Sequence, residues 1–501
     1  MAREYITATV GSPNRPDCTE PGSRLPAAQG RLKNARDLFV IVVVGLTLYL
    51  PYLGQQHYLA SHEMRHAEIA REMASSGDMV VSTLLGHRYA DKPPGLYIAV
   101  ASLYRMNNGP SLALARAPSV AAAISAAVAL YLLALLFDDR RCALLAALGL
   151  MSIGGYSAMA RDARPDMAMT ATLLLACLCA GYGMASKSAA RRAILFGMAG
   201  IACAVSILVK GPVGPVCFAI FVGAATLDRS LKFPILSEWV ILVGAMLAVL
   251  SIWIIPAFLR DHGAYLMAML QQRDLSMTPD NKTHSPVWYV GVVPQRFLPF
   301  TLFCPLLIFD VRSRGWRPAL TTALLLLVIL SVAPKKRVQY PLPVYPFLTL
   351  AVAESIFAFG RRWIIQGAVV LTGAWLIGTA VFFDLIQRRL VTFQNPAMLV
   401  APSLLNLIPS HTSVVSFGDI AEAIAFVGRR DRVSEVNYYS AMLPEIKTGG
   451  VGGYVVIPEK DCKAILAKID AQATLTPEFA EQLPLSSKPR GWKVYRVDAI
   501  K

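Results

Sequence analysis

Long apolar runs separated by short polar stretches fill the chain from Leu38 to Leu385. A helix needs about 20 apolar residues, with a range of roughly 17 to 25, to cross the hydrocarbon layer of a membrane. On this criterion the pattern predicts about eleven membrane-spanning helices. The apolar stretch Pro93–Met106 is shorter, and we expect it to form an interfacial or re-entrant helix. The predicted spans are Leu38–Leu53, Ala117–Phe137, Cys142–Met159, Met167–Ala185, Ala193–Val209, Val213–Leu227, Trp239–Leu259, Phe297–Val311, Ala319–Ala333, Leu342–Phe359 and Trp363–Leu385.

The pattern changes after residue 387, where short apolar runs alternate with helical patterns. Such alternation is typical of a small α/β domain. The predicted strands are Ser413–Phe417, Gly453–Ile457 and Trp492–Val497, and the predicted helices are Ile420–Arg429 and Asp461–Ala471.

The amino terminus differs from both of these regions. Residues 1–36 are rich in Pro, Gly and Arg and lack an apolar core, so we expect a flexible basic tail. The sequence therefore predicts a polytopic α-helical membrane protein in three parts. The tail is followed by a transmembrane domain over residues 37–387 and a soluble α/β domain over residues 388–501.

Composition supports a membrane protein. The chain has 501 residues, of which 55% are hydrophobic and only 16% charged, and its mean hydropathy is +0.49. A soluble protein of this length would be more polar. The net charge of +16 could indicate a nucleic-acid partner, but Lys and Arg cluster between apolar runs, as in membrane proteins, so we expect no nucleic acid. Most of the eight cysteines lie in apolar runs and predict no disulfide framework.

The distribution of basic residues predicts the orientation, because Lys and Arg near the ends of spans prefer the cytoplasm. This places the amino terminus in the cytoplasm and the carboxy-terminal domain on the outer side of the membrane. The first large outward loop then covers residues 54–116. The predicted cytoplasmic loops are Asp138–Arg141, Ser186–Arg192, Asp228–Lys232, Arg312–Arg317 and Gly360–Arg362.

A few cations break this rule, because they fall on loops predicted to face outward. They are Lys92, Lys210 and the run from Lys335 to Arg337. Charge kept this close to lipid is commonly functional, and an anionic partner such as a lipid-linked phosphate would suit it.

The first outward loop begins with a strongly helical segment, Ser61–Ser75. It contains His62-Glu63-Met64-Arg65-His66, an H-E-x-x-H pattern in which two histidines bind zinc and the glutamate acts as general base. A membrane metalloprotease is therefore one alternative, with His62 and His66 as metal ligands. The cation Arg65 beside the metal position and the lack of a clear third ligand argue against it. The charged residues Glu68, Arg71 and Glu72 further along the helix have a simpler alternative as surface ion pairs.

The segment from His62 to Ile69, with Gly77-Asp78 and Lys92-Pro93-Pro94, closely resembles the first periplasmic loop of bacterial 4-amino-4-deoxy-L-arabinose lipid A transferases. These are relatives of the dolichyl-phosphate-mannose mannosyltransferases, family 39-like glycosyltransferases of the C type. The resemblance covers roughly residues 38–359. Further family segments follow in order at Arg161–Asp166, Lys210–Pro212, Gln272-Arg273, His284–Pro286 with Trp288-Tyr289, and Lys336–Pro346.

The resemblance implies a C-type architecture of about 11–13 transmembrane helices. It further implies an inverting transfer of a sugar from undecaprenyl phosphate to lipid A or another envelope acceptor on the periplasmic side, as in lipopolysaccharide modification. The implied phosphate-binding residues are Lys92, Lys210, Arg273, Lys336 and Tyr340. The implied catalytic residues are His62, Glu63 and Asp166, with Asp162 as a competing choice, and Arg65 and His284 are further candidates.

One departure concerns the acid at the start of the first loop. The family has Asp before the Glu, whereas this chain has His62 before Glu63. Either His62 serves as the base, Glu63 takes that role, or the acceptor needs no base. A divalent metal held by His62 and His66 is a further hypothesis.

Purely structural roles are alternatives to these catalytic and phosphate-binding roles. Lys92 and Lys210 could be interfacial lysines that reach toward water. Asp162 and Asp166 could form plain salt bridges with Arg161 or Arg164. A non-catalytic protein that binds a polyprenyl lipid or a partner is the second alternative to a transferase.

Overall fold

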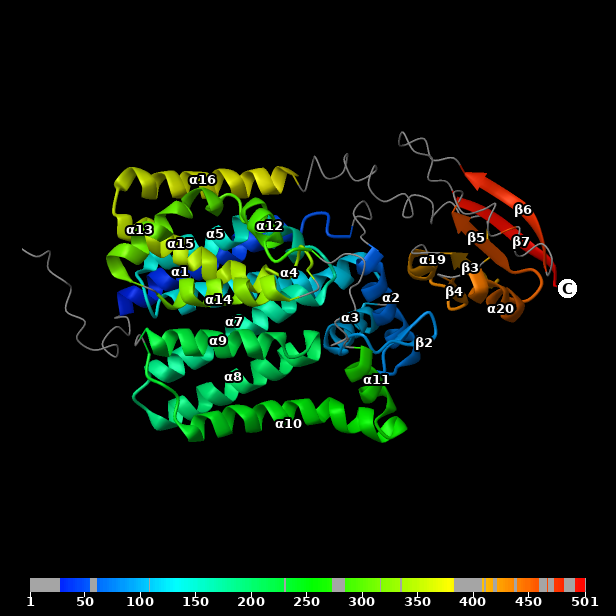
Figure 1. Cartoon of the computed structure of the whole chain (residues 1–501), viewed down its shortest axis with the longest axis horizontal. Helices are drawn as coiled ribbons and strands as arrows, with labels where there is room; N and C mark the ends of the chain where they lie inside the picture. Colours follow the sequence, from blue (N-terminus) through cyan, green and yellow to red (C-terminus); the bar gives the residue numbers. More distant parts are fainter. Residues whose placement is uncertain are drawn as a thin grey trace, which may run out of the picture.

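The computed structural model describes residues 28–54, 61–107, 109–228, 231–272, 284–315, 317–333, 336–382, 408–409, 411–417, 421–436, 439–458, 466, 473–481 and 492–500. Its helices form a long bundle, with α2, α3, α11 and a carboxy-terminal sheet at one end, on the right in Figure 1. The first helices are α1 Ala28–Tyr49, α2 Ser61–Ser76, α3 Gly95–Met106, α4 Leu112–Ala134, α5 Arg140–Ser152, α6 Gly154–Ala160, α7 Pro165–Ala185, α8 Ala189–Lys210 and α9 Val213–Leu227. Then follow α10 Leu236–Asp261, α11 Ala264–Gln272, α12 Trp288–Arg296, η1 Phe300–Phe303, α13 Pro305–Arg314, α14 Pro318–Val332, η2 Leu342–Val344, α15 Tyr345–Phe359 and α16 Arg362–Val381.

Each predicted apolar span falls largely on described helix, and residues 383–385 of the last span lie outside the described residues. Six described helices are long and apolar enough to cross a membrane, and the bent pair α5–α6 would make a seventh. The six are α4, α7, α8, α10, the continuous segment Leu342–Phe359 and α16, while α9 and α14 are shorter apolar helices. The prediction of a polytopic helical membrane protein is confirmed.

Two predicted spans are broken. The run Cys142–Met159 bends by 68° between α5 and α6, where Ile153 leaves the helical conformation before Gly154 and Gly155. Paired glycines favour such a break because they stabilise the helix poorly. The run Phe297–Val311 is divided into η1 and α13, and Pro305 begins α13, where its missing N–H removes no helical hydrogen bond.

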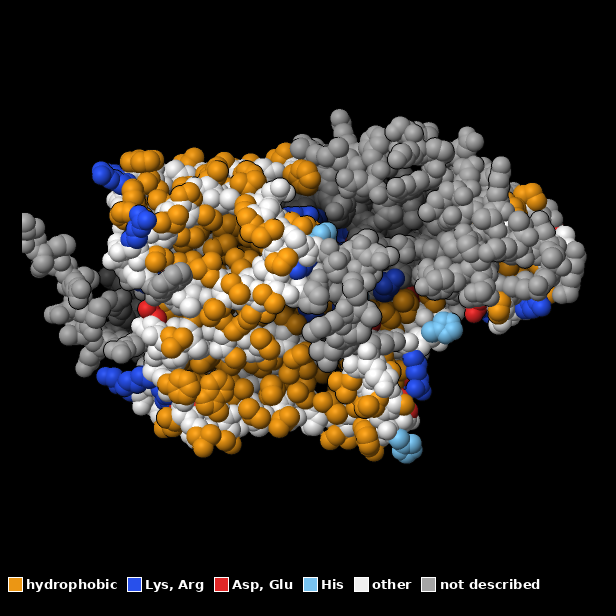
Figure 2. Space-filling view, viewed as in Figure 1, with side chains coloured by type: hydrophobic (Ala, Val, Ile, Leu, Met, Phe, Trp, Pro, Cys, Tyr) orange, Lys and Arg blue, Asp and Glu red, His pale blue; other side chains and the backbone are white. Residues whose placement is uncertain are grey.

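The sides of the bundle are apolar, as a lipid-facing surface requires. Figure 2 shows hydrophobic side chains over its flank, with Lys and Arg gathered near its left edge. Helices α10 and α16 expose large apolar side chains, including Leu247, Ile252 and Val370. Inside the bundle, small residues allow helices to approach closely. At Gly200 on α8, for example, a Cβ would clash with the Leu242 carbonyl oxygen of α10.

The end opposite α2 and α3 is fastened by ion pairs between loops. Arg140 at the start of α5 pairs with Asp37 on α1, and Arg192 on α8 pairs with Glu238 on α10. Arg317 before α14 lies 3.1 Å from Asp138 in the α4–α5 loop. These ion pairs join helix ends that are distant in sequence, and each contains an arginine of a loop predicted to be cytoplasmic.

At the other end, α2 and α3 form a layer across the bundle. Helix α3, predicted as interfacial, packs against α2 and α4, and buries Tyr97 and Tyr104. A short hairpin of β1 Thr83–Leu84 and β2 His87–Arg88 adjoins α2. Glu68 and Arg71 of α2 do form an ion pair, but its predicted surface location is wrong, since Glu68 is 0% exposed and Arg71 only 6%.

The carboxy-terminal unit contains a five-stranded sheet in the order β4-β3-β5-β7-β6. Strands β3, β4 and β5 are parallel, and β7 runs antiparallel to β5 and β6. The three predicted strands fall on β3, β5 and β7 and one predicted helix on α19, whereas Asp461–Ala471 lies outside the described residues except for 466. The elements are β3 Val414–Phe417, α19 Ala421–Gly428, β4 Val433–Val436, α20 Tyr439–Gly449, β5 Tyr454–Pro458, β6 Ala473–Glu481 and β7 Trp492–Ile500.

The apolar pattern missed β4, α20 and β6. Strand β6 lies at the edge of the sheet and contains Pro477, which edge strands tolerate because one row of their N–H groups faces away from the sheet.

Candidate functional site

Three buried carboxylates gather at the end of the bundle that carries α2 and α3. Glu63 lies on α2, Asp162 in the α6–α7 loop and Asp166 in the first turn of α7. Their exposed fractions are 1%, 7% and 5%. Buried carboxylates need partners, so the contacts of each one show what it is able to do.

Glu63 is fully engaged by its neighbours. Arg116 on α4 donates to both of its oxygens, at 2.6 and 2.9 Å, and the Ala163 N–H donates to Oε1 at 3.0 Å. Arg116 also donates to the Leu53 carbonyl at 2.8 Å. Glu63 therefore links α2, α4 and the α6–α7 loop, and three hydrogen bonds hold its carboxylate in this structural position.

Asp166 is paired with Lys210. Pro165 begins α7, and a carboxylate in the first turn of a helix is favoured by the positive end of the helix dipole. The Lys210 ammonium ends α8, forms an ion pair with Asp166, and lies 5.3 Å from the centre of the Tyr340 ring. Gly211 stops α8 with a φ of +84°, a conformation that a side chain disfavours. The structure thus brings Asp166, Lys210 and Tyr340 together.

Asp162 is only partly satisfied. One of its oxygens lies 2.7 Å from Arg164 Nε, and the other has no hydrogen-bond partner among the described residues. Burial, and next the nearby charge of Glu63, raise the pKa of Asp162 to about 7, although Arg164 and Arg116 act in the opposite direction. A buried carboxylate with a raised pKa and an open oxygen is typical of functional sites.

A cavity of about 180 Å³ adjoins Asp162. The phenol oxygen of Tyr345 is also buried without a hydrogen-bond partner among the described residues. Arg164 and Arg296 line the cavity against one carboxylate, that of Asp162, so the cavity suits a small polar group with negative charge. Its lining comprises Gly155, Ala158, Met159, Asp162, Arg164, Arg296, Val338, Gln339, Leu342 and Tyr345.

Lys92 lies in the loop before α3 and pairs with Asp91 at 2.8 Å. The Tyr89 hydroxyl donates to the same carboxylate at 3.0 Å. The loop approaches α8 closely, since a Cβ at Gly95 would lie 2.7 Å from the Leu208 carbonyl oxygen in the last turn before Lys210. The Lys92 loop and Lys210 therefore belong to one region.

Lys336 is buried and is 6% exposed. Its ammonium donates to two backbone carbonyls, those of His284 at 3.1 Å and Ala333 at 2.7 Å. The exposed His284 ring stacks on Trp288 with centroids 4.2 Å apart. In this arrangement Lys336 holds two loop segments together.

The remaining predicted residues are placed less completely. Arg273 lies outside the described residues, and so does the side chain of His62, although His62 belongs to α2. Arg65 lies on the same helix, and its charge acts on the Tyr89 hydroxyl. His66 Nδ1 lies 3.1 Å from the Tyr97 hydroxyl. Among the residues that the structure describes, no group of three or more His, Cys, Asp and Glu side chains could hold a metal.

The sequence analysis missed three residues of this region, Arg116, Arg296 and Tyr345. Arg116 had a usable signal, because it stands beside a predicted span and charge so close to lipid is commonly functional. Arg296 had the same signal, because it directly precedes the predicted span Phe297–Val311. Tyr345 had none, because the cavity that it lines exists only after distant segments pack together.

Comparisons with known proteins show which proteins the chain is similar to in sequence and fold. The family model for dolichyl-phosphate-mannose-protein mannosyltransferase matches residues 35–262. The undecaprenyl phosphate-alpha-4-amino-4-deoxy-L-arabinose arabinosyl transferase of Shewanella sediminis is 28% identical over 341 residues, and that of Aeromonas salmonicida 27% over 403 residues. The alignments cover 66% and 76% of this chain. This chain spans 62% of the length of the first relative and 68% of the second.

Solved structures show the same fold. The crystal structure of ArnT from Cupriavidus metallidurans bound to undecaprenyl phosphate has a TM-score of 0.72 at 17% identity and covers 94% of this chain and 98% of its own. The oligosaccharyltransferase of Archaeoglobus fulgidus has a TM-score of 0.55 at 11% identity, covering 87% of this chain and 71% of its own. The chain is therefore similar to the 4-amino-4-deoxy-L-arabinose arabinosyl transferases in sequence and shares the fold of ArnT from Cupriavidus metallidurans.

Proposed function

We propose that the protein is an inner-membrane glycosyltransferase that moves a sugar from undecaprenyl phosphate to lipid A or another envelope acceptor. The observation that carries this proposal is the grouping of Lys210, Asp166 and Tyr340 beside a cavity that Asp162 and two arginines line. The names of the relatives support the class of the donor, a sugar carried on undecaprenyl phosphate.

The reaction breaks the bond between the anomeric carbon and the carrier's phosphate oxygen, and the phosphate leaves with the bonding electrons. An acceptor oxygen attacks the anomeric carbon from the opposite face, so the configuration inverts. Stabilising the charge on the leaving phosphate is the main electrostatic task of such a site. Lys210 is suited to that task, with the Tyr340 hydroxyl and Lys92 as further donors, and Asp166 orients the Lys210 ammonium.

Proton transfer depends on the acceptor. A phosphate acceptor is already anionic and needs no base, whereas a hydroxyl acceptor must lose a proton. Asp162 suits that second case, because it lines the cavity and its pKa is raised to about 7. Glu63 then acts as a structural link rather than as a base, and His62 and Arg273 retain their predicted roles as a candidate base and a phosphate ligand.

The finer architecture also belongs to this proposal. About eleven spans, a cytoplasmic amino terminus and a periplasmic carboxy-terminal α/β domain would place α2, α3 and the three carboxylates at the outer membrane surface. This is the face where lipid A and the sugar-bearing carrier would meet.

The direct test uses purified protein in lipid nanodiscs with undecaprenyl-phosphate-linked 4-amino-4-deoxy-L-arabinose and lipid A. Mass spectrometry should show lipid A with one added aminopentose, and Lys210→Ala should abolish the product. Mass spectrometry of glycolipids from cells with and without the protein identifies the sugar if a different one is used. Intact lipid A and unchanged glycolipids in both experiments would contradict a transferase.

A metalloprotease is the competing function. It would require Glu63 as the base, whereas Glu63 is held by Arg116 and the Ala163 N–H. Peptide cleavage that needs zinc and disappears in His66→Ala would favour the protease.

A further inference from the structure

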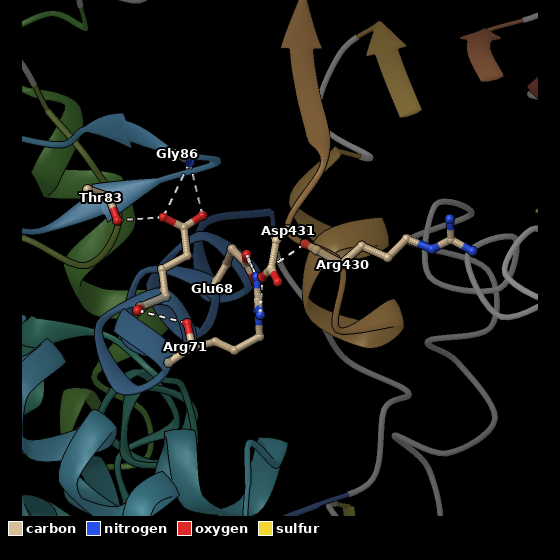
Figure 3. Close-up of polar contacts among 8 residues, drawn as sticks. Glu68, Arg71, Thr83, Gly86, Arg430 and Asp431 are labelled. Carbon is tan, nitrogen blue, oxygen red and sulfur yellow. Dashed lines mark hydrogen bonds and ion pairs between the residues drawn. The ribbon is translucent and has the colours of Figure 1, made fainter. Parts of the chain in front are cut away.

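The carboxy-terminal unit is fastened to α2 by a buried arginine (Figure 3). Arg71 donates to both oxygens of Glu68 on its own helix, at 2.9 and 2.8 Å. It also reaches across to the carboxy-terminal unit, donating to Asp431 at 2.9 Å and to the Arg430 carbonyl at 3.2 Å. One guanidinium therefore links two segments that are about 360 residues apart.

Apolar contacts accompany this polar link. The Phe426 ring of α19 lies 6.5 Å from the Tyr104 ring of α3. Phe426 joins the same apolar cluster as Met64 of α2 and Ala163 of the α6–α7 loop. This cluster is continuous from the carboxy-terminal unit to the loop that carries Asp162.

The hairpin beside α2 makes a second contact. Leu85 packs against the apolar core of the carboxy-terminal sheet. Glu72 fixes that hairpin to α2, accepting from the Thr83 hydroxyl at 2.6 Å and from the Gly86 N–H at 3.2 Å (Figure 3). The carboxy-terminal unit therefore rests on α2 both directly and through the hairpin.

The same helix carries Glu63, which holds the Ala163 backbone next to Asp162. Eight residues of helix separate Glu63 from Arg71, which corresponds to about 12 Å along the axis. A short helix of this kind moves as a rod, so a shift at Arg71 also shifts Glu63.

We propose that Arg71 is a positioning residue, through which the carboxy-terminal unit holds α2, and with it Glu63 and the Asp162 loop, in place for transfer. The inference rests on the proposed function. The unit thereby acts on the rate of the chemical step and leaves the binding of the carrier lipid unchanged.

The test must separate positioning from a general loss of folding. Burial raises the pKa of Glu68 to about 7 while Arg71 opposes that shift, so removing Arg71 alone would leave a costly buried charge. The double variant Glu68→Gln/Arg71→Gln removes both charges together. Phe426→Ala weakens the apolar contact without changing any charge. Asp498→Asn is the matched control, because Asp498 pairs with Arg496 at 3.0 Å within β7.

Three measurements on the full chain in nanodiscs complete the experiment. They are kcat and KM with undecaprenyl-phosphate-linked 4-amino-4-deoxy-L-arabinose, binding of undecaprenyl phosphate, and hydrogen exchange of α2. In both the double variant and Phe426→Ala we expect faster exchange in α2 and a kcat lowered about tenfold, because small displacements of reacting groups cost rate. KM, carrier binding and the control variant should stay at the wild-type values.

An unchanged kcat despite faster exchange in α2 would overturn the positioning role. A parallel loss of carrier binding would also overturn it, since the effect would then be a general loss of structure. Wild-type protein without any transfer would overturn the proposed function, whereas active wild-type protein with normal kcat in both variants would overturn the positioning role alone.

Discussion

The two ends of the bundle contain similar chemistry used differently. At the end opposite α2, Asp37 accepts from Arg140 and from the Tyr131 hydroxyl, and Glu238 accepts from Arg192 and from the Ile235 N–H. At the α2 end the pairs are Glu63 with Arg116, Asp166 with Lys210 and Asp162 with Arg164. Buried ion pairs alone therefore do not identify a functional site.

The difference lies in what remains unsatisfied. Asp162 lines a cavity, has one oxygen without a hydrogen-bond partner among the described residues and has a raised pKa, and Lys210 lies at a loop junction over Tyr340. Glu238, in contrast, uses its carboxylate to close the first turn of α10 and to hold α8. Incomplete partnering beside a cavity distinguishes the candidate site from structural pairing.

The largest effect should follow from breaking the Glu63–Arg116 pair. Arg116→Ala leaves the buried Glu63 carboxylate unpaired, and we expect a loss of about 3–5 kcal/mol in the free energy of unfolding. Thermal unfolding in detergent measures this. The double variant Glu63→Gln/Arg116→Met should recover much of the loss, and a single variant as stable as wild type would contradict the assigned burial.

Lys210→Ala should reduce transfer at least about 100-fold, which corresponds to about 2.7 kcal/mol of transition-state stabilisation. The reason is the loss of the cation placed between Asp166 and Tyr340. Lys232→Ala is the matched control, an exposed lysine in the loop at the opposite end. Equal rates in the two variants would remove Lys210 from the site.

Asp162→Asn should stabilise the protein at neutral and higher pH. The folded-state pKa of Asp162 is about 7 against an ordinary value of 3.8, so its contribution to stability is present below pH 3.8 and is lost as the pH rises through 7. The free energy of unfolding of Asp162→Asn, taken relative to that of wild type, should be about 1–3 kcal/mol higher at pH 8 than at pH 4. Unfolding temperatures at the two pH values measure the difference, and a pH-independent difference would contradict the raised pKa.

Glu238→Gln, at the opposite end, should have the smallest effect on stability, and it should destabilise the protein where Asp162→Asn stabilises it. It weakens the bond to Arg192 and the closure of α10, which should cost about 1 kcal/mol. Transfer should stay at the wild-type rate when both proteins are folded. A loss of activity larger than the loss of folded protein would erase the distinction between the two ends.

The sequence predicted the parts that depend on local pattern. The apolar runs predicted the helices correctly, because each segment that crosses lipid must satisfy its own backbone N–H and C=O groups, which a helix does. The breaks at Ile153 and before Pro305 needed packing information, although the Gly154-Gly155 pair was visible. Motif order also brought Asp166, Lys210 and Tyr340 into one set, and the structure places these three together.

The sequence could not predict partnerships across long separations. The link from Glu63 to Arg116 spans 53 residues and that from Arg71 to Asp431 spans 360. The H-E-x-x-H pattern predicted that Glu63 acts as a general base, a role that its hydrogen bonds to Arg116 and Ala163 do not favour. Likewise, Lys336 was predicted to bind phosphate, whereas its ammonium is held by two carbonyls in this structure.

An experimental structure with bound undecaprenyl phosphate would test directly whether Lys210 and Tyr340 bind the carrier's phosphate. We expect the phosphate at the α2 end, within direct hydrogen-bond reach of the Lys210 ammonium, about 2.7–3.2 Å, and close to the Tyr340 hydroxyl. A phosphate bound at the opposite end, beside Arg192 or Arg317, would contradict it.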